Sequence, residues 1–595
     1  MSIQPQGFTR VASVAEVAEG KPKAVRVKGH SIALFNVGGR IYATDNQCPH
    51  MGYPLTRGAI RHGVLTCDWH GWSFDLEGGG CFVGGCDDLT TFPVEVRDGE
   101  IWLDLNKADS SRRQNRLLLL QEGLLSEDSW TLSKAIALLL ADGLPEKDVI
   151  ELFVKHMGRH IATHRGADGG RNVAHLINGI KVARRYETDD RLIPLMLAAN
   201  GASGPAGDRP PVEPLPPPVT WEKIENWVRA FSGERFAEGI EKCLVTARHL
   251  GGHDDGILPL LYECAVQPHF FGFIDNLLFL GYLAELVEEL GWAQSSELVC
   301  NLSAALLGRS RSAAERFQLE AMKIYGPIEA AMEPATKDGV SNPPADDAYD
   351  EEALVQALGS GNLDAIFQGV TDVLVAGVDP DRIISTLVLV AADRMARTAV
   401  NLNPGWGALT AELNLAASLR TAKRHGGPLV TRKALYHAGY RHFEDRWLNI
   451  TTRPLTTALG DNTLDMKSAR EQVNQVNNEE AAIASIQDSI ESVRVNEVGN
   501  QVREYLIAGF SGDRLLHATG NTILKDDTGN FILPTLRTVF DEWENPRIAR
   551  HPARHQLLVG LARYATDVRR RKGSKSAALT AQRFARGQTA VDLYD

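Results

Sequence analysis

Two short segments of the chain place a cysteine beside a histidine. Residues 48–50 read CPH and residues 67–70 read CDWH, with sixteen residues between the two segments and a glycine soon after each histidine, at Gly52 and Gly71. A thiolate and an imidazole are both good ligands for iron or zinc, so two loops that each supply one of them can complete a four-ligand site. The pattern therefore predicts a metal centre.

The spacing of these ligands resembles that of one iron–sulfur family. Two irons joined by sulfides need four protein ligands, and two cysteines on one iron with two histidines on the other is a known solution. The motif Cys-x-His, sixteen residues, Cys-x-x-His-Gly-Trp resembles the Rieske ferredoxin family over residues 5–106. The resemblance implies one [2Fe-2S] Rieske cluster, with Cys48 and Cys67 on the inner iron and His50 and His70 on the outer, solvent-facing iron.

A structural zinc ion held by the same four side chains is the alternative. Zinc loops usually carry their ligands at C-x2-4-C or H-x3-5-H spacing, which neither segment has. High-potential Rieske proteins carry an extra cysteine in each loop, where this sequence has Tyr53 and Trp69. The resemblance is therefore to the lower-potential ferredoxin or oxygenase type. We expect Cys81 and Cys86, in a glycine-rich segment, to be free thiols.

Strand-like segments flank the two loops and must position them. Residues 24–44 contain two runs of alternating apolar residues joined by Gly38-Gly39, which predicts a β-hairpin. A second hairpin is predicted where two apolar runs flank residues 97–99. Both Cys-His segments lie between these hairpins, so the sequence predicts a small all-β Rieske domain over residues 1–108.

The remainder of the chain predicts a large all-α region of loosely repeated helical units. Apolar residues at three- and four-residue spacing indicate helices over 115–332, with a proline-rich linker at 203–219, and again over 350–595. Similar phrases, in which a helix ends at a glycine and restarts about six residues later, suggest four diverged copies. The glycines concerned are Gly143, Gly251, Gly377 and Gly509.

One predicted helix, residues 148–164, carries a stripe of histidines beside an apolar face. His156, His160 and His164 follow one another at four-residue spacing, and His175 opens the next helix. Two histidines four residues apart can hold a metal with a third ligand from elsewhere. His156, His160 and His175 are therefore the candidate catalytic residues, and we expect them to bind a second metal ion, iron. The alternative is a half-exposed helix edge that is rich in histidine.

Rieske oxygenases hold a mononuclear iron with two histidines and a carboxylate. Their pattern is approached here only at His437 and His442, where the position of the required acid is Ala434. Five residues along a helix turn these two side chains about 140° apart. We expect His437 and His442 to have core and cap roles.

These features favour an oxidoreductase, with oxygenase chemistry open, in which the cluster passes electrons to a site in the helical region. One alternative is an electron-transfer or redox-sensing protein whose helices dock a partner, and another is a zinc domain on an interaction scaffold. No GxGxxG fingerprint follows a strand, so we expect a separate reductase or ferredoxin to donate electrons. The acceptor is an unidentified small-molecule substrate or protein.

Composition limits the partners and the compartment. The 595 residues carry a net charge of -12, which argues against a nucleic acid or an anionic membrane surface as the main partner. The sequence has no apolar run of membrane-spanning length and does not open like a signal peptide, so we expect a cytoplasmic protein. In a reducing compartment, the seven cysteines are not expected to form a disulfide framework.

Overall fold

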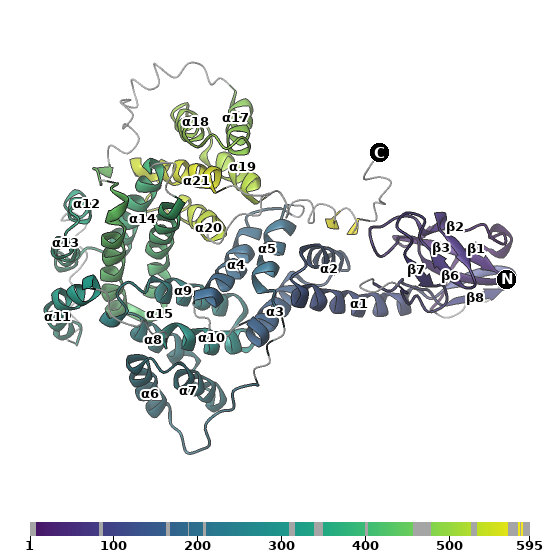
Figure 1. Ribbon diagram of the computed structural model, residues 1–595, viewed down its shortest axis with the longest axis horizontal. Helices are drawn as coiled ribbons and strands as arrows, with labels where there is room; N and C mark the ends of the chain where they lie inside the picture. Colours follow the sequence, from purple (N-terminus) through teal and green to yellow (C-terminus); the bar gives the residue numbers. More distant parts are fainter. Residues whose placement is uncertain are drawn as a thin grey trace. The chain divides into compact units, whose positions relative to one another are not determined.

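The polypeptide folds into two compact units, called here the N-terminal unit, Met1–Val149 with Ser576–Asp595, and the helical unit, Ile150–Lys575 (Figure 1). A computed structural model describes residues 7–82, 87–161, 167–187, 190–205, 207, 210–308, 316–337, 349–398, 403–450, 452–455, 478–524, 532–568, 581–582 and 585–586. The prediction of a small all-β domain followed by a large helical region is confirmed.

Three antiparallel sheets, each of three strands, make up the β part of the N-terminal unit. Both predicted hairpins are present, and positive φ angles at Gly38, Gly39, Asp98 and Gly99 form their turns. Neighbouring strands in the sheets are β1 (Thr9–Ser13), β9 (Glu100–Leu103) and β8 (Val94–Arg97); β2 (Lys23–Val27), β3 (His30–Val37) and β4 (Arg40–Asp45); and β5 (Ala59–Arg61), β6 (Val64–Thr66) and β7 (Ser73–Asp75).

Strand β3 is buried on both faces and separates two apolar cores. Successive side chains of a strand point to opposite faces. Ile32 and Leu34 therefore enter one core, whereas Ala33 and Phe35 enter the other. The second core also contains Cys48 and Cys67, so the folding of β3 directly supports the loops that carry the metal-binding pattern.

A helical hairpin follows the last strand within the N-terminal unit. Helix α1 (Leu105–Ser126) begins two residues after β9 and packs against α2 (Ser129–Ala141). The Asp128 side chain caps α2 by accepting a hydrogen bond of 2.8 Å from the Thr131 amide. The residues up to Val149 therefore belong to the same compact unit as the β strands. The boundary of the Rieske domain at residue 108 stays a prediction.

The elements of secondary structure in the described residues of the helical unit are all helices. The proline-rich stretch 203–219 connects two of them without a described helix or strand of its own. The helices, beginning with one that spans the boundary between the units, are α3 (Glu146–His156), η3 (Met157–Ile161), α4 (Ala167–Ala183), α5 (Leu192–Ala202), α6 (Trp221–Glu234), α7 (Ala237–Leu250), α8 (Asp254–Ala265), η4 (Pro268–Phe270), α9 (Ile274–Leu290), α10 (Trp292–Leu307), α11 (Arg316–Lys337), α12 (Glu351–Gly359), α13 (Leu363–Val375), α14 (Pro380–Arg397), α15 (Asn403–Glu444), η6 (Asp445–Leu448), α17 (Glu479–Glu491), α18 (Val495–Ile507), α19 (Gly512–Leu524), α20 (Ile532–Trp543), η8 (Pro552–His555) and α21 (Gln556–Asp567).

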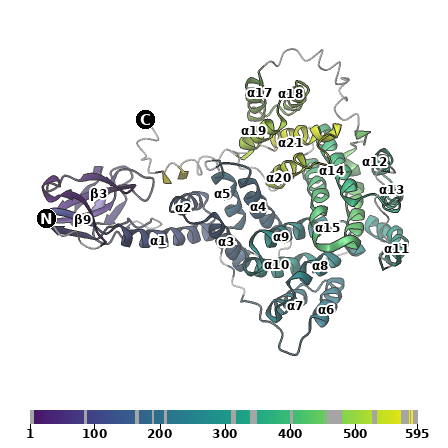
Figure 2. The ribbon, with the colours of Figure 1, turned by 180° about the vertical axis from the view of Figure 1, so that it is seen from behind.

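Helix α15 is the centre of the helical unit. It packs against α8, α9, α13, α14 and α20, and both views show it beside α14 (Figures 1 and 2). Its axis breaks at Gly427, where φ is 77°, immediately before Pro428. Among the described residues, no helix is long and apolar enough to cross a membrane.

The helix ends were predicted correctly at the four recurring glycines. Gly143, Gly251, Gly377 and Gly509 all have positive φ, between 70° and 84°, and each follows a helix. Glycine is favoured there because a side chain is rarely accommodated in the left-handed region. The proposal that these phrases mark four copies of one unit stays a prediction.

His437 is a core residue, as expected. Only 5% of its surface is exposed, its ring stacks on Phe271 at 4.5 Å, and its Nε2 lies 3.1 Å from the carbonyl oxygen of Val266. Burial lowers the pKa of His437 to about 4.

His442 lies in a buried ionic cluster that joins α15 to α14. Its Nδ1 is 2.6 Å from a Glu412 carboxylate oxygen, and Arg394 pairs with the same carboxylate. Burial opposes ionisation of Glu412, but Arg394 and His442 outweigh it and lower its pKa to about 2. His437 therefore packs in the core, whereas His442 takes part in buried ionic contacts between two helices.

The buried His437 makes the stability of the helical unit depend on pH. Between its ordinary pKa of 6.5 and the folded value of about 4, the unfolded chain binds a proton that the folded chain refuses. Stability therefore falls as pH is lowered through this window, by about 2 kcal/mol between pH 7 and pH 5. In denaturant titrations at both pH values, His437→Asn should be less stable than wild type yet lose about 2 kcal/mol less on acidification. An unchanged pH slope would contradict the assignment.

Candidate metal centre

The first Cys-His loop follows β4 and closes on itself through backbone hydrogen bonds. The Cys48 amide donates to the Tyr53 carbonyl at 2.9 Å, and the Gly52 amide donates back to the Cys48 carbonyl at 2.8 Å. Gly52 has a φ of 78°, which explains why glycine occupies this position.

The second loop, between β6 and β7, repeats this geometry. The Cys67 amide donates to the Trp72 carbonyl at 2.8 Å, and the Gly71 amide donates to the Cys67 carbonyl at 3.0 Å. Gly71 has a φ of 74°. In both loops the partners lie five and four residues beyond the cysteine, so the two loops present their cysteines through the same turn.

The two cysteine thiols meet in the apolar core. Cys48 is 2% exposed and Cys67 is 1% exposed. The Cys48 thiol hydrogen-bonds to Cys67 and, with two backbone amides, lowers the pKa of Cys67 to about 6, while the same pairing and burial raise the pKa of Cys48. Backbone amides two and three residues after each cysteine are directed at its sulfur: those of His50 and Met51 at Cys48, and those of Trp69 and His70 at Cys67.

The two imidazoles also lie together, nearer to solvent. The rings of His50, which is half-buried, and His70, which is exposed, have centroids 4.8 Å apart. Trp72 stacks on His50 at 4.0 Å, and Trp69 lies 4.1 Å from His70. Burial, His70 and Lys134 lower the pKa of His50, which favours the neutral ring that a metal requires.

The donor atoms are thus sorted into a buried sulfur pair and an outer imidazole pair. The Nδ1 atom of His50 is buried without a hydrogen-bond partner, as expected for a nitrogen whose lone pair is reserved for a metal. Within the described part of the chain, no group of three or more His, Cys, Asp or Glu side chains is placed to hold one metal ion. The four side chains of the loops are arranged as two pairs.

Apolar side chains surround the sulfur pair. Phe35, Leu55, Leu65 and Phe74 share its core, and Trp69 and Trp72 pack against this core from the rim. The sulfur side of the two loops is therefore enclosed by apolar and aromatic side chains.

Cys81 corrects one expectation. It takes part in a disulfide rather than being a free thiol, whereas Cys86 lies outside the described residues. The five free cysteines among the described residues are all buried.

The histidine stripe of the helical unit holds a loop in place. His156 is 8% exposed, so it does not lie on a half-exposed edge, and its Nε2 is 3.1 Å from the Gly204 carbonyl oxygen. His160 lies 4.7 Å from it, ring to ring, and its Nδ1 accepts a hydrogen bond from the Gly207 amide at 3.3 Å. The two rings therefore bind the backbone at the start of the proline-rich stretch.

The third expected residue of this group bonds within its own helix. His175 Nδ1 lies 3.1 Å from the carbonyl oxygen of Arg171, one turn earlier in α4. His164 is outside the described residues. The second metal expected at His156, His160 and His175 therefore gains no support.

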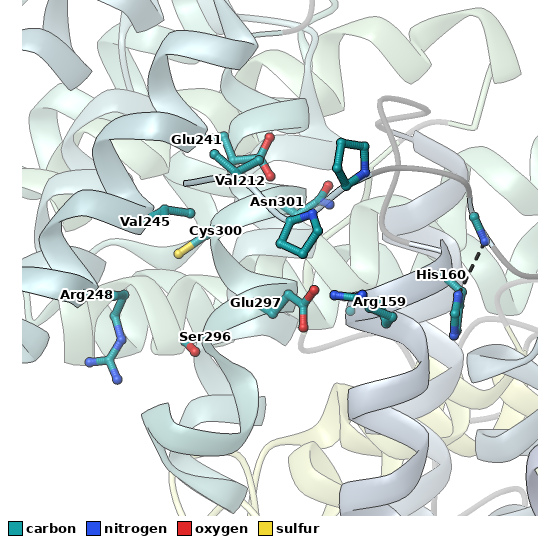
Figure 3. Close-up of a pocket in the computed structure, with 14 residues that line it drawn as sticks. Arg159, His160, Val212, Glu241, Val245, Arg248, Ser296, Glu297, Cys300 and Asn301 are labelled. Atoms are coloured by element: carbon teal, nitrogen blue, oxygen red, sulfur yellow. Dashed lines mark hydrogen bonds between the residues drawn. The ribbon is translucent and has the colours of Figure 1, made fainter. Parts of the chain in front are cut away.

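A pocket of about 310 Å³ does lie beside His160 (Figure 3). The π-helical turn η3 contributes Arg159 and His160 to its wall. Such turns are frequent at functional sites. Polar and charged side chains from α7 and α10 complete much of the wall: Glu241, Arg248, Ser296, Glu297, Cys300 and Asn301.

Comparison with known proteins concerns the N-terminal unit. A family model described as Rieske [2Fe-2S] domain matches residues 7–93. The 3-phenylpropionate/cinnamic acid dioxygenase ferredoxin subunit of Escherichia coli (strain K12) is 39% identical over 98 residues, 16% of this chain and 91% of that protein. The 4beta-methylsterol monooxygenase of Methylococcus capsulatus is 36% identical over 98 residues, 14% of this chain, which spans only 25% of that enzyme.

Among solved structures, the Sphingomonas yanoikuyae B1 ferredoxin is similar at 35% identity. The match covers 16% of this chain and 96% of the ferredoxin, with a TM-score of 0.16. The residues matched by the family model end before α1 begins.

The geometry assigns His156 a structural role that can be measured. Removing a buried ring that hydrogen-bonds to a backbone carbonyl should lower the free energy of unfolding by about 1–3 kcal/mol. We expect His156→Ala to show this loss in denaturant titrations, with His175→Ala as the milder control because its bond is local and half-buried. Iron content should be the same in both variants and in wild type. Loss of iron from His156→Ala would contradict a purely structural role.

Proposed function

Because the chain belongs to the Rieske [2Fe-2S] family through residues 7–93, we propose that its N-terminal unit holds a [2Fe-2S] cluster and exchanges single electrons with other redox groups. The family relationship implies the cluster, and the cluster supplies a one-electron couple when bound. The observation that carries the proposal is the sorting of the donor atoms into a buried thiol pair and an outer imidazole pair.

We assign the inner iron to Cys48 and Cys67 and the outer iron to His50 and His70. The burial of the thiols and the greater exposure of the imidazoles support this assignment. So does the unpartnered Nδ1 of His50, a free donor atom in an otherwise enclosed position. A single zinc ion would need all four donors around one point, whereas the loops bring them together as a buried thiol pair and an outer imidazole pair.

Other residues of the loops stabilise charge and exclude water. The backbone amides directed at the two sulfurs donate hydrogen bonds that favour the thiolate forms. Phe35, Leu65 and Phe74 keep water from the sulfur side. His70, the more exposed imidazole, then provides the edge through which electrons enter and leave.

The role we favour is that of an electron carrier joined to a helical unit. The N-terminal part matches nearly the full length of a dioxygenase ferredoxin subunit, which supports a carrier rather than a complete oxygenase. A separate reductase or ferredoxin would reduce it. The helical unit would then bind the protein that accepts the electron.

An oxidoreductase is the second candidate, and the pocket beside His160 favours it. With about 310 Å³ and a wall that includes Arg159, Glu241 and Arg248, this pocket has room for a small polar substrate. Such a substrate would receive electrons that originate from the separate donor protein. This second candidate does not include a second iron, because His156 and His160 are already hydrogen-bonded to the backbone of the proline-rich stretch.

A reductive titration of the full-length protein tests the proposed function. A carrier with one Rieske cluster should accept one electron per chain, and the visible absorbance should bleach in proportion. Uptake of more than one electron would favour a further redox group in the helical unit, and hence the oxidoreductase. Protein that accepts no electron would contradict both candidates.

The ligand assignment predicts which cysteine the cluster needs. Cys67→Ala should abolish the cluster, because one iron loses one of its two thiolate ligands. Cys300→Ala is the matched control, since Cys300 is equally buried but lies in helix α10 of the helical unit. Iron and acid-labile sulfide per chain should fall to background in the first variant and stay at wild-type levels in the second. Zinc without sulfide in wild type would refute the assignment.

A further inference from the structure

A lysine from the helical hairpin reaches the first cluster loop. Lys134 lies on α2, is 5% exposed, and donates a hydrogen bond of 2.5 Å to the carbonyl oxygen of Pro49. Pro49 separates Cys48 from His50 in the chain. The ammonium group also forms an ion pair with Asp87, which lies in the segment between β7 and β8.

Burial of the Lys134 ammonium group costs free energy that its contacts with the Pro49 loop must offset. Burying an ammonium group is unfavourable, and an apolar side chain of similar length would pack at lower cost. Lys134 is nevertheless enclosed, and its two oxygen partners lie 85 and 47 residues away in the sequence. A cavity of about 90 Å³ beside it is lined by further polar groups, including Gln47, Asn115 and Arg116. The hairpin therefore meets the loop through a polar contact.

The position of the charge gives it an electrical consequence. Reduction adds one negative charge to the cluster, so a buried cation next to a ligand loop stabilises the reduced form, and a buried anion destabilises it. Lys134 therefore raises the reduction potential of the cluster, and Asp87 lowers it. Because Lys134 is enclosed and Asp87 is partly buried, salt screens the effect of the lysine more weakly than that of the aspartate.

We propose that Lys134 is a positioning residue that fixes the Pro49 segment and, with Asp87 as its counter-charge, sets the reduction potential of the cluster from the helical hairpin. The inference rests on the proposed function, since it requires a cluster at the two loops. It extends the redox site beyond the residues matched by the family model, because Lys134 lies outside 7–93.

A charge cycle on the full-length holoprotein tests the proposal by spectroelectrochemical titration. Lys134→Met should lower the midpoint potential, because the cation is lost while the charge of Asp87 remains. Asp87→Asn should raise it, because the cation remains. The double variant should shift the potential less than Lys134→Met, and Lys134→Arg should restore most of the wild-type value. Lys23→Met, which breaks an exposed ion pair with Glu16 in the same unit, should leave the potential unchanged.

The outcomes separate this inference from the proposed function. Colourless wild-type protein would defeat the proposed function itself. Coloured variants in which Lys134→Met and Asp87→Asn shift the potential in the same direction, or not at all, would overturn the role of Lys134 while leaving the cluster in place. Should Lys134→Met fail to fold, Asp87→Asn alone decides, since an unchanged or lowered potential contradicts the proposal. The paramagnetic spectrum of the reduced protein should also change in Lys134→Met, because the Pro49 loop loses its anchor, and Lys134→Arg should recover it.

Discussion

The meeting of two cysteine thiols in an apolar core is the constraint on which the rest of the N-terminal unit depends. Cys48 and Cys67 can meet because two loops with the same backbone hydrogen bonds enter the core beneath β3. The loops then carry His50 and His70 together to the outer side of the thiols. Neither pair would be assembled without the other, because each loop supplies one member of both. The four side chains thus form a thiol pair and an imidazole pair, which is the arrangement that the proposed two-iron cluster requires.

The parts of the fold and site that could be predicted from the sequence are those with local causes. Paired glycines specify the tight turn between β3 and β4, and the spacing of ligands within each loop is a property of a few consecutive residues. Helix ends at Gly143 and Gly251 were likewise predictable from the residue type alone. The ligand types and their order in the chain were enough to indicate the family.

The parts that could not be predicted depend on partners distant in the sequence. His156 and His160 have the spacing of metal ligands, and only the return of the chain at Gly204 and Gly207 shows that their nitrogens are already engaged. The reach of Lys134 to Pro49 spans 85 residues and crosses the boundary expected at 108. In the helical unit, histidine, a residue type that often binds metals or catalyses reactions, has a structural role at His442, where it joins a buried ionic contact between helices. Residue type and spacing indicate what a group can do, and burial and bonding decide whether it is available.

The measurement that tests the central claim most directly is pulsed electron paramagnetic resonance of the reduced full-length protein, prepared with ¹⁵N-labelled histidine. We predict a signal from the mixed-valence cluster that is coupled to two histidine nitrogens, one each from His50 and His70. The coupling from one of them should disappear in His70→Cys protein that retains a cluster. A signal with no histidine coupling, or reduced protein with no paramagnetic signal, would contradict the assignment of two cysteines and two histidines to one two-iron cluster.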